Sequence, residues 1–372
     1  MWLLLVCATR WPIYEPYGVW GRRPQPPEAL SVMTDLPEPR ANPDLFGHEA
    51  AESLLAQAAR SGRLHHAWLL LGRPGIGKAT LAYRFARRLL AGGEITDLFL
   101  PPTHRTFRRV AAGSHADLLT IEREWDEKKG RRRGEILVDS VRTVSSFLHL
   151  TPAEGGWRVV VIDGAECLNR SAANALLKVL EEPPPRAILL LVCSAAGRLL
   201  PTIRSRCRRL ALDPLPDAVL ARLLEAGRPD LAAPARAGLV GLAQGSIGRA
   251  LVLAQENGTA LAALAARALA HPTRLTTAEA LASWEGIGRE DEAFATWMDF
   301  LREGLASAVR EAAAGTPQPA LGDRPLGEWV EIWQALGRIR DVTLGLHLDK
   351  CEAVVQGFGL LAGRVRPEAA IS

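Results

Sequence analysis

Lysine is scarce in this chain of 372 residues, and several kinds of sequence signal are missing. Only five of the 45 basic residues are lysines. The five cysteines form no Cys-x-x-Cys pair, so the sequence signals neither a structural zinc site nor a disulfide framework. No apolar run reaches the roughly 18–20 residues that a membrane-spanning helix needs, and none is predicted. Isolated cysteines are typical of a reducing compartment, and we expect the cytoplasm.

The overall composition is that of an ordinary globular protein. Hydrophobic residues make up 48% and charged residues 23% of the chain. The length corresponds to about two to three domains. The net charge of +4 is compatible with nucleic-acid binding without indicating it, and the chain carries no familiar DNA- or RNA-binding motif.

The beginning of the chain differs from the rest. Residues 1–32 hold three of the ten tryptophans and show neither helical nor strand periodicity. Arg10 follows the apolar stretch 2–8, whereas a secretory signal has its basic residues first. Met33 precedes a polar lead-in that suits a natural start. We therefore expect residues 1–32 to be a disordered extension or a mis-assigned start.

Short apolar runs alternate with helical patterns between residues 44 and 212. This alternation predicts an α/β fold, with a parallel sheet that carries helices on both faces. A polar insertion at Glu122–Glu135 interrupts the pattern, and its Lys128–Arg133 segment is basic. We expect an exposed loop there, with a contact to a phosphate backbone as the alternative. The predicted strands are Ala67–Leu71, Asp117–Ile121, Val159–Asp163, Ala187–Cys193 and Arg209–Leu212.

Helical spacing replaces the strand pattern after residue 212. Proline and glycine residues punctuate this part, and Gly315–Pro325 is expected to connect two helices. Trp329 and Trp333 lie four residues apart, which places them on one helical face and predicts a role in packing. The predicted domains are a nucleotide-binding-like domain at 33–212, a helical lid at 213–255 and an all-α domain at 256–372.

A glycine-rich phosphate loop follows the first predicted strand. The segment 72–80 reads Gly-x-x-x-x-Gly-Lys between a strand and a helical pattern. Gly72, Gly75 and Gly77 let backbone N–H groups turn toward a phosphate, and Lys78 supplies positive charge to the outer phosphates. A glycine turn without a ligand is the alternative. The segment therefore predicts binding of ATP or ADP.

Two parts needed for hydrolysis are missing from this pattern. Ala79 stands where Ser or Thr would bind Mg²⁺, and Thr80, about 100° further round the helix, is a poor substitute. Asp163 ends a buried strand and can offer a carboxylate to a metal, but Gly164 follows where active enzymes carry Glu. Glu166 lies beyond the strand, and we expect it to be solvated. The sequence thus predicts a compromised Mg²⁺ site and weak or absent ATPase activity.

With these residues placed, the chain resembles the clamp-loader branch of the AAA+ ATPases from Leu45 to about Leu361. Within that branch it is most similar to the non-hydrolysing, stator-like subunit type of bacterial DNA polymerase III. The resemblance implies an AAA+ P-loop sheet, a helical lid and an all-α collar for oligomerisation. The stretches that carry it are His65–Trp68, Gly113–Leu118, Ile136–Arg142, Asn174–Pro184, Leu200–Cys207 and Gly245–Leu251.

The resemblance also implies roles for two arginines. Arg206, within Ser205-Arg206-Cys207, matches an arginine finger that reaches the ATP of a neighbouring subunit. A solvated basic edge is the alternative for Arg206. Arg249 matches the lid residue that senses nucleotide, and a plain helix-surface arginine is the alternative. The zinc module common in the family is not expected, because the segment 90–113 contains no cysteine.

The function implied is help in loading a sliding clamp onto primed DNA. The partners implied are gamma/tau and delta subunits, with the clamp and primed DNA contacted through the assembled complex. An active AAA+ ATPase of the gamma/tau type is the alternative, and Ala79 and Gly164 count against it. A P-loop nucleotide kinase is a more remote alternative. Polymerase activity belongs to another subunit, since nothing in the sequence resembles a polymerase active site.

Overall fold

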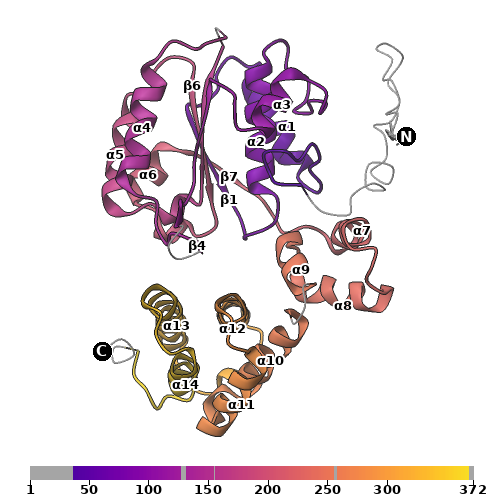
Figure 1. Ribbon diagram of the computed structural model, residues 1–372, viewed down its shortest axis with the longest axis vertical. Helices are drawn as coiled ribbons and strands as arrows, with labels where there is room; N and C mark the ends of the chain where they lie inside the picture. The colour runs from indigo at the N-terminus through magenta and orange to yellow at the C-terminus, as the bar shows by residue number, and fades with distance from the viewer. Residues whose placement is uncertain (1–36, 127–130, 155, 255–257, 368–372) are drawn as a thin grey trace, which may run out of the picture.

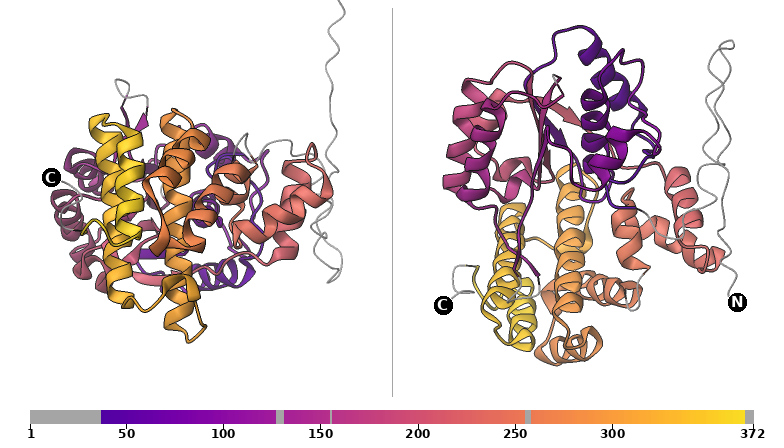
Figure 2. Two further views of the ribbon diagram at one scale, coloured as in Figure 1. Left: turned by 90° about the horizontal axis from the view of Figure 1, so that it is seen from below. Right: turned by 45° about the horizontal axis from the view of Figure 1, so that its top comes forward.

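The computed structural model describes residues 37–126, 131–154, 156–254 and 258–367. The prediction for residues 1–32 therefore lies outside the described residues. Figure 1 shows a sheet with helices in the upper part, a small group of helices at one side and a larger group of helices below. Figure 2 shows the same arrangement from two further directions.

The upper part is built on a five-stranded parallel sheet. Its strand order is β2-β5-β6-β1-β7, and each neighbouring pair is parallel. The strands begin and end within one residue of the predicted runs, so the predicted α/β class is confirmed. The strands are β1 (Ala67–Leu71), β2 (Leu118–Ile121), β5 (Arg158–Asp163), β6 (Ala187–Cys193) and β7 (Arg208–Ala211).

Helices cover both faces of this sheet, as Figure 1 shows. Along β1, Trp68 and Leu70 pack into the core of one face, while Ala67 and Leu69 pack into the core of the other. Because both faces are covered, the strands are continuous apolar runs. The helices of the first face are α1 (Glu49–Arg60), α2 (Lys78–Ala91) and α3 (Arg105–Ala111). Those of the second are α4 (Val138–His149), α5 (Arg170–Glu181) and α6 (Pro201–Arg206).

The polar insertion is not simply a loop. Within the segment expected to be an exposed loop, strands β3 (Trp125–Asp126) and β4 (Arg131–Arg132) pair in an antiparallel ribbon that the sequence did not predict. The Arg133 backbone N–H donates to the Glu124 carbonyl at 2.8 Å and extends the pairing by one bond. Lys128 and Lys129 lie outside the described residues.

Every described element after β7 is helical. The helices of the side group are α7 (Asp217–Gly227), α8 (Ala233–Ala243) and α9 (Ile247–Leu253). The lower group is α10 (Gly258–Ala270), α11 (Thr277–Ile287), α12 (Asp291–Ala313), α13 (Leu326–Leu346) and α14 (Lys350–Leu361). A single hydrophobic cluster runs through both groups, from Leu220 to Leu361. In the described part of the chain, no helix is both long and apolar enough to cross a membrane.

A short turn separates the last two helices, α13 and α14. His347 adopts the left-handed conformation with φ 55°, and the Asp349 side chain then accepts the Glu352 N–H at 2.9 Å as a helix cap. The predicted packing role of Trp329 is confirmed, since its ring is fully buried and its Nε1 donates to the Leu321 carbonyl at 3.2 Å.

Candidate functional site

The predicted phosphate loop lies between β1 and α2. Three of its glycines have positive φ, 154° at Gly72, 73° at Gly75 and 107° at Gly77. Residues with a Cβ rarely adopt these conformations, so the glycines allow the loop to turn tightly. Lys78 begins α2 directly after the loop. The strand–loop–helix context of the motif is therefore present.

The lysine of the loop forms hydrogen bonds with other groups of the protein. Lys78 is buried, and its Nζ donates to the Arg73 carbonyl at 2.6 Å and to the Ser194 Oγ at 2.9 Å. Burial lowers the pKa of the Lys78 ammonium, while the negative charges of Glu166 and Asp163 oppose that shift. Two of its three N–H donors thus have partners without any phosphate.

Glu166 lies close to this lysine, which corrects the expectation that it is solvated. Gly164 turns the chain after β5 with φ 79°, and a short 3₁₀ turn at Ala165–Cys167 follows. The Glu166 Oε1 accepts the Ser194 N–H at 3.1 Å, and its Oε2 is buried without a hydrogen-bond partner. The turn folds Glu166 back against the end of β6. No local pattern other than Gly164 signals this reversal.

The site does not offer a suitable set of ligands for Mg²⁺. Ala79 has no side-chain oxygen, and its methyl group packs at the edge of the sheet core. Thr80 is buried on α2. Asp163 at the end of β5 is then the remaining motif carboxylate, whereas Mg²⁺ prefers near-octahedral oxygen coordination. The residues of the motif do not fit the metal.

The first residues of α9 are in direct contact with the phosphate loop. The Gly248 N–H donates to the Gly75 carbonyl at 3.0 Å. The Ser246 Oγ donates to the Pro74 carbonyl at 2.8 Å and also caps α9 by accepting the Arg249 N–H. The start of α9 therefore lies directly against the phosphate loop.

Close packing at Gly75 leads to a first prediction. A Cβ at this position would lie 2.8 Å from the Gly248 Cα and 2.6 Å from the Ser246 Oγ, at φ +73°. We expect Gly75→Ala to lower the free energy of unfolding by about 1–3 kcal/mol, measured by urea unfolding. Gly197→Ala is the control, because nothing lies within 4 Å of its added Cβ. Equal stability of the two variants would show that the lid does not sit tightly on the loop.

Arg249 is paired with the lower group of helices. Its guanidinium forms an ion pair with Glu303 of α12 and lies over the Phe300 ring, 5.1 Å from the ring centre. Burial, together with the nearby positive charge of Arg73, lowers the pKa of Arg249 to about 10. The structure thus engages this side chain with α12. The sensing role that the resemblance implies stays a prediction.

Arg206 is the last residue of α6 and is partly exposed. Its Nη2 lies 2.9 Å from the Glu181 Oε1, and its Nη1 donates to the Thr202 carbonyl at 3.1 Å. Cys207, which follows, is buried, and burial raises the pKa of its thiol to about 12. A thiol with so high a pKa is unreactive at neutral pH. Within the Ser-Arg-Cys stretch, the cysteine anchors the segment and the arginine faces outward.

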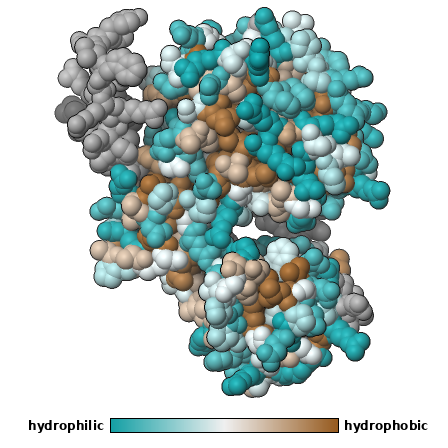
Figure 3. All heavy atoms as spheres, turned by 180° about the vertical axis from the view of Figure 1, so that it is seen from behind, coloured by the Kyte–Doolittle hydropathy of each residue, from teal (hydrophilic) through white to brown (hydrophobic). Residues whose placement is uncertain are grey.

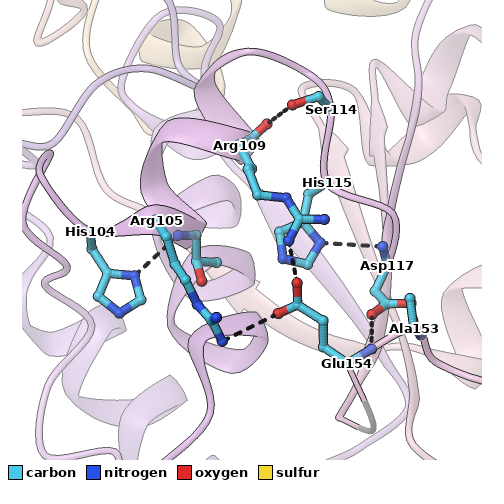
Figure 4. Close-up of polar contacts among 9 residues, drawn as sticks. His104, Arg105, Arg109, Ser114, His115, Asp117, Ala153 and Glu154 are labelled. Carbon is cyan, nitrogen blue, oxygen red and sulfur yellow. Dashed lines mark hydrogen bonds and ion pairs between the residues drawn. The ribbon is translucent and has the colours of Figure 1, made fainter.

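The stretch Gly113–Leu118 has a structural role in this chain, as Figure 4 shows. The Asp117 carboxylate is buried and accepts the Ala153 N–H at 2.8 Å and the Glu154 N–H at 3.1 Å. Arg158 forms an ion pair with it at 3.5 Å. Asp117 therefore ties the start of β2 to the turn before β5.

Comparison with known proteins identifies the relatives of this chain. Residues 47–216 match the family model described as DNA polymerase III, delta subunit. The DNA polymerase III subunit delta' of Pseudomonas aeruginosa is 40% identical over 205 residues, which are 52% of this chain and 57% of that protein. The corresponding subunit of Escherichia coli is 36% identical over 211 residues, or 54% and 58% of the two chains.

This part of the chain is similar to DNA polymerase III delta-prime subunits. The chain spans little more than half the length of these delta-prime relatives. A tau/gamma subunit of Haemophilus influenzae is 31% identical over 232 residues, which are 61% of this chain and 32% of that protein. A gamma-subunit-related protein of Thermotoga maritima of known structure is 19% identical, with a TM-score of 0.39, and covers 85% of this chain and 98% of that one. The similarity to delta-prime subunits rests on the sequence matches.

Sequence reasoning missed several side chains around the motifs of this site. Glu303 pairs with Arg249 from more than fifty positions away, as counted along the sequence, and Gln244 accepts from Arg73 at 2.8 Å. No local spacing signals such long-range pairs. Glu181 lay within the matched Leu-Glu-Glu-Pro-Pro stretch, yet only the fold brings it to Arg206.

Proposed function

We propose that this chain is a delta-prime-type subunit of a DNA polymerase III clamp loader. In this function it binds gamma/tau and delta subunits in the cytoplasm and helps to load the sliding clamp onto primed DNA. Support comes from the match of residues 47–216 to the family and from the delta-prime relatives. The observation that carries the proposal is the contrast between a partly exposed Arg206 and a phosphate loop whose Lys78 already donates to two groups of the protein.

In the proposed mechanism Arg206 acts on the ATP of the neighbouring subunit. A guanidinium that approaches the transferred phosphoryl group stabilises the charge that spreads over its oxygens. Arg206 is suited to this because its side chain is 36% exposed while Cys207 fixes the backbone behind it. The rate effect of such a finger is about 10³–10⁵ in related systems.

The chain's own nucleotide site is proposed to be degenerate. Lys78 already donates to two protein groups, and Ser246 and Gly248 donate to carbonyl groups of the loop. Bound ATP or ADP would have to replace the contacts of Lys78, and Ala79 would still leave Mg²⁺ without its hydroxyl ligand. Efficient hydrolysis by this chain alone is not expected.

The lower group of helices is proposed to form the collar that joins the subunits. Figure 3 shows apolar side chains gathered on the rear of this group. Within the lower group of helices and its connections, large hydrophobic side chains are exposed at Leu281, Val330, Leu346 and Leu348. Exposed apolar residues of this size are consistent with burial against neighbouring subunits.

A lysine variant tests the degenerate site. We expect Lys78→Ala to leave ATP turnover and clamp loading by the assembled complex within about twofold of the native values, because Lys78 serves the fold rather than a phosphate. The measurement is steady-state ATPase activity with clamp and primed DNA. The matched control replaces the phosphate-loop lysine of the gamma subunit, which should abolish turnover. A loss of tenfold or more with Lys78→Ala in a correctly assembled complex would contradict the proposal.

A further inference from the structure

We propose that Glu181 is a positioning residue that holds the Arg206 guanidinium in the orientation used on the neighbour's ATP. This inference rests on the proposed function of Arg206. Glu181 is the last residue of α5, and its Oε1 lies 2.9 Å from the Arg206 Nη2. A carboxylate at this distance forms an ion pair with the guanidinium.

Two contacts together define the orientation of the Arg206 head group. The Glu181 carboxylate forms an ion pair with Nη2 of Arg206, and the Thr202 carbonyl accepts a hydrogen bond from Nη1 at 3.1 Å. A guanidinium is planar and has five N–H donors in a fixed fork. Two contacts therefore fix its plane and still leave three donors for phosphate oxygens.

Buried neighbouring residues hold the backbone at both Glu181 and Arg206. Leu180, next to Glu181, is buried, and so are Ile203 and Cys207 on either side of Arg206. All three buried side chains belong to the same core cluster between the sheet and helices α5 and α6. The C-terminal ends of α5 and α6 are thus fixed relative to each other. Glu181 can therefore restrict the conformations of the Arg206 side chain.

Glu181 and Arg206 are both partly exposed, so their ion pair is not needed for the stability of the fold. The side chain of Glu181 is 50% exposed and that of Arg206 is 36% exposed. Ion pairs at such positions contribute little to folding stability. A residue of this kind can change the geometry of catalysis while leaving stability and assembly almost unchanged, and that difference makes the role testable.

If Glu181 instead inhibited Arg206, its removal would have the opposite effect on the rate. If Glu181 merely neutralised Arg206 and had to release it, removal of the carboxylate would raise the rate. If Glu181 positions Arg206, removal lowers the rate, because a mobile arginine spends less time in the productive orientation. The sign of the change in kcat separates the two roles.

The experiment measures kcat and KM for ATP in a loader reconstituted from gamma, delta and the full chain, with clamp and primed DNA. We expect Glu181→Ala to lower kcat by about three- to tenfold while KM stays within about twofold. Glu181→Gln should recover part of the native kcat, because the amide oxygen keeps the shape and polarity of the carboxylate beside the guanidinium but not its charge. Glu182→Ala is the matched control on the adjacent exposed glutamate and should behave as the native chain.

Companion variants separate this inference from the function on which it rests. Arg206→Ala combined with Glu181→Ala should be no slower than Arg206→Ala alone. If Arg206→Ala slows turnover but Glu181→Ala leaves kcat unchanged or raises it, the positioning role is wrong and the finger stands. If Arg206→Ala has no effect, the finger itself is wrong, and this inference falls with it. Unfolding midpoints and subunit assembly of each variant exclude a folding defect as the cause.

Discussion

Replacing Arg206 by alanine should slow ATP turnover of the reconstituted clamp loader by tenfold or more, which corresponds to at least about 1.4 kcal/mol of activation free energy. The reason is the loss of a guanidinium that stabilises transferred charge at the neighbouring subunit's phosphates. The arginine is partly exposed and belongs to no core cluster, so the folded chain and its assembly should persist. The measurement is steady-state ATP hydrolysis with clamp and primed DNA present.

Two further variants sharpen this test. Arg206→Lys keeps the charge but loses the planar fork, and it should restore only part of the rate. Arg209→Ala removes an exposed arginine from the same basic edge, on β7, and should change turnover by less than about twofold. Equal losses from Arg206→Ala and Arg209→Ala would favour a general basic surface over a finger.

Replacing Asp117 by alanine should lower the free energy of unfolding by about 3–5 kcal/mol. The side chain is 1% exposed, and its removal leaves Arg158 as a buried charge without its carboxylate partner. The backbone N–H groups of Ala153 and Glu154 also lose their acceptor. Urea unfolding followed by circular dichroism measures the difference.

The control variants for Asp117 differ in charge and in burial. Asp117→Asn keeps an acceptor oxygen but not the charge, so its loss of stability should be smaller. Glu154→Ala removes a carboxylate that pairs with Arg109 at a more exposed place and should cost about 0–1 kcal/mol. A loss below about 1 kcal/mol for Asp117→Ala would show that the buried network does not hold β2 in place.

The sheet and the phosphate loop could be predicted because they depend on local sequence. Strands such as Val159–Asp163 are continuous apolar runs, since helices cover both faces of the sheet. The loop glycines have a fixed spacing that follows from the need for positive φ. Each of these features is therefore determined by a few neighbouring residues in the sequence.

The remaining features depend on contacts between distant parts of the chain. The 3₁₀ turn after Gly164 brings Glu166 to the Ser194 N–H, which no periodicity signals. The contact between Gly248 of α9 and Gly75 of the phosphate loop joins residues more than 170 positions apart in the sequence. The short β3–β4 ribbon was missed because two-residue strands have no measurable alternation.

The central claim is that this chain acts on a neighbour's ATP and not on its own. The most direct test is the steady-state ATP turnover of the purified chain by itself, with Mg²⁺, beside the same preparation added to gamma and delta subunits. We predict no turnover above background for the chain alone and full stimulation of the assembled complex. Turnover by the chain alone that Lys78→Ala abolishes would contradict the account.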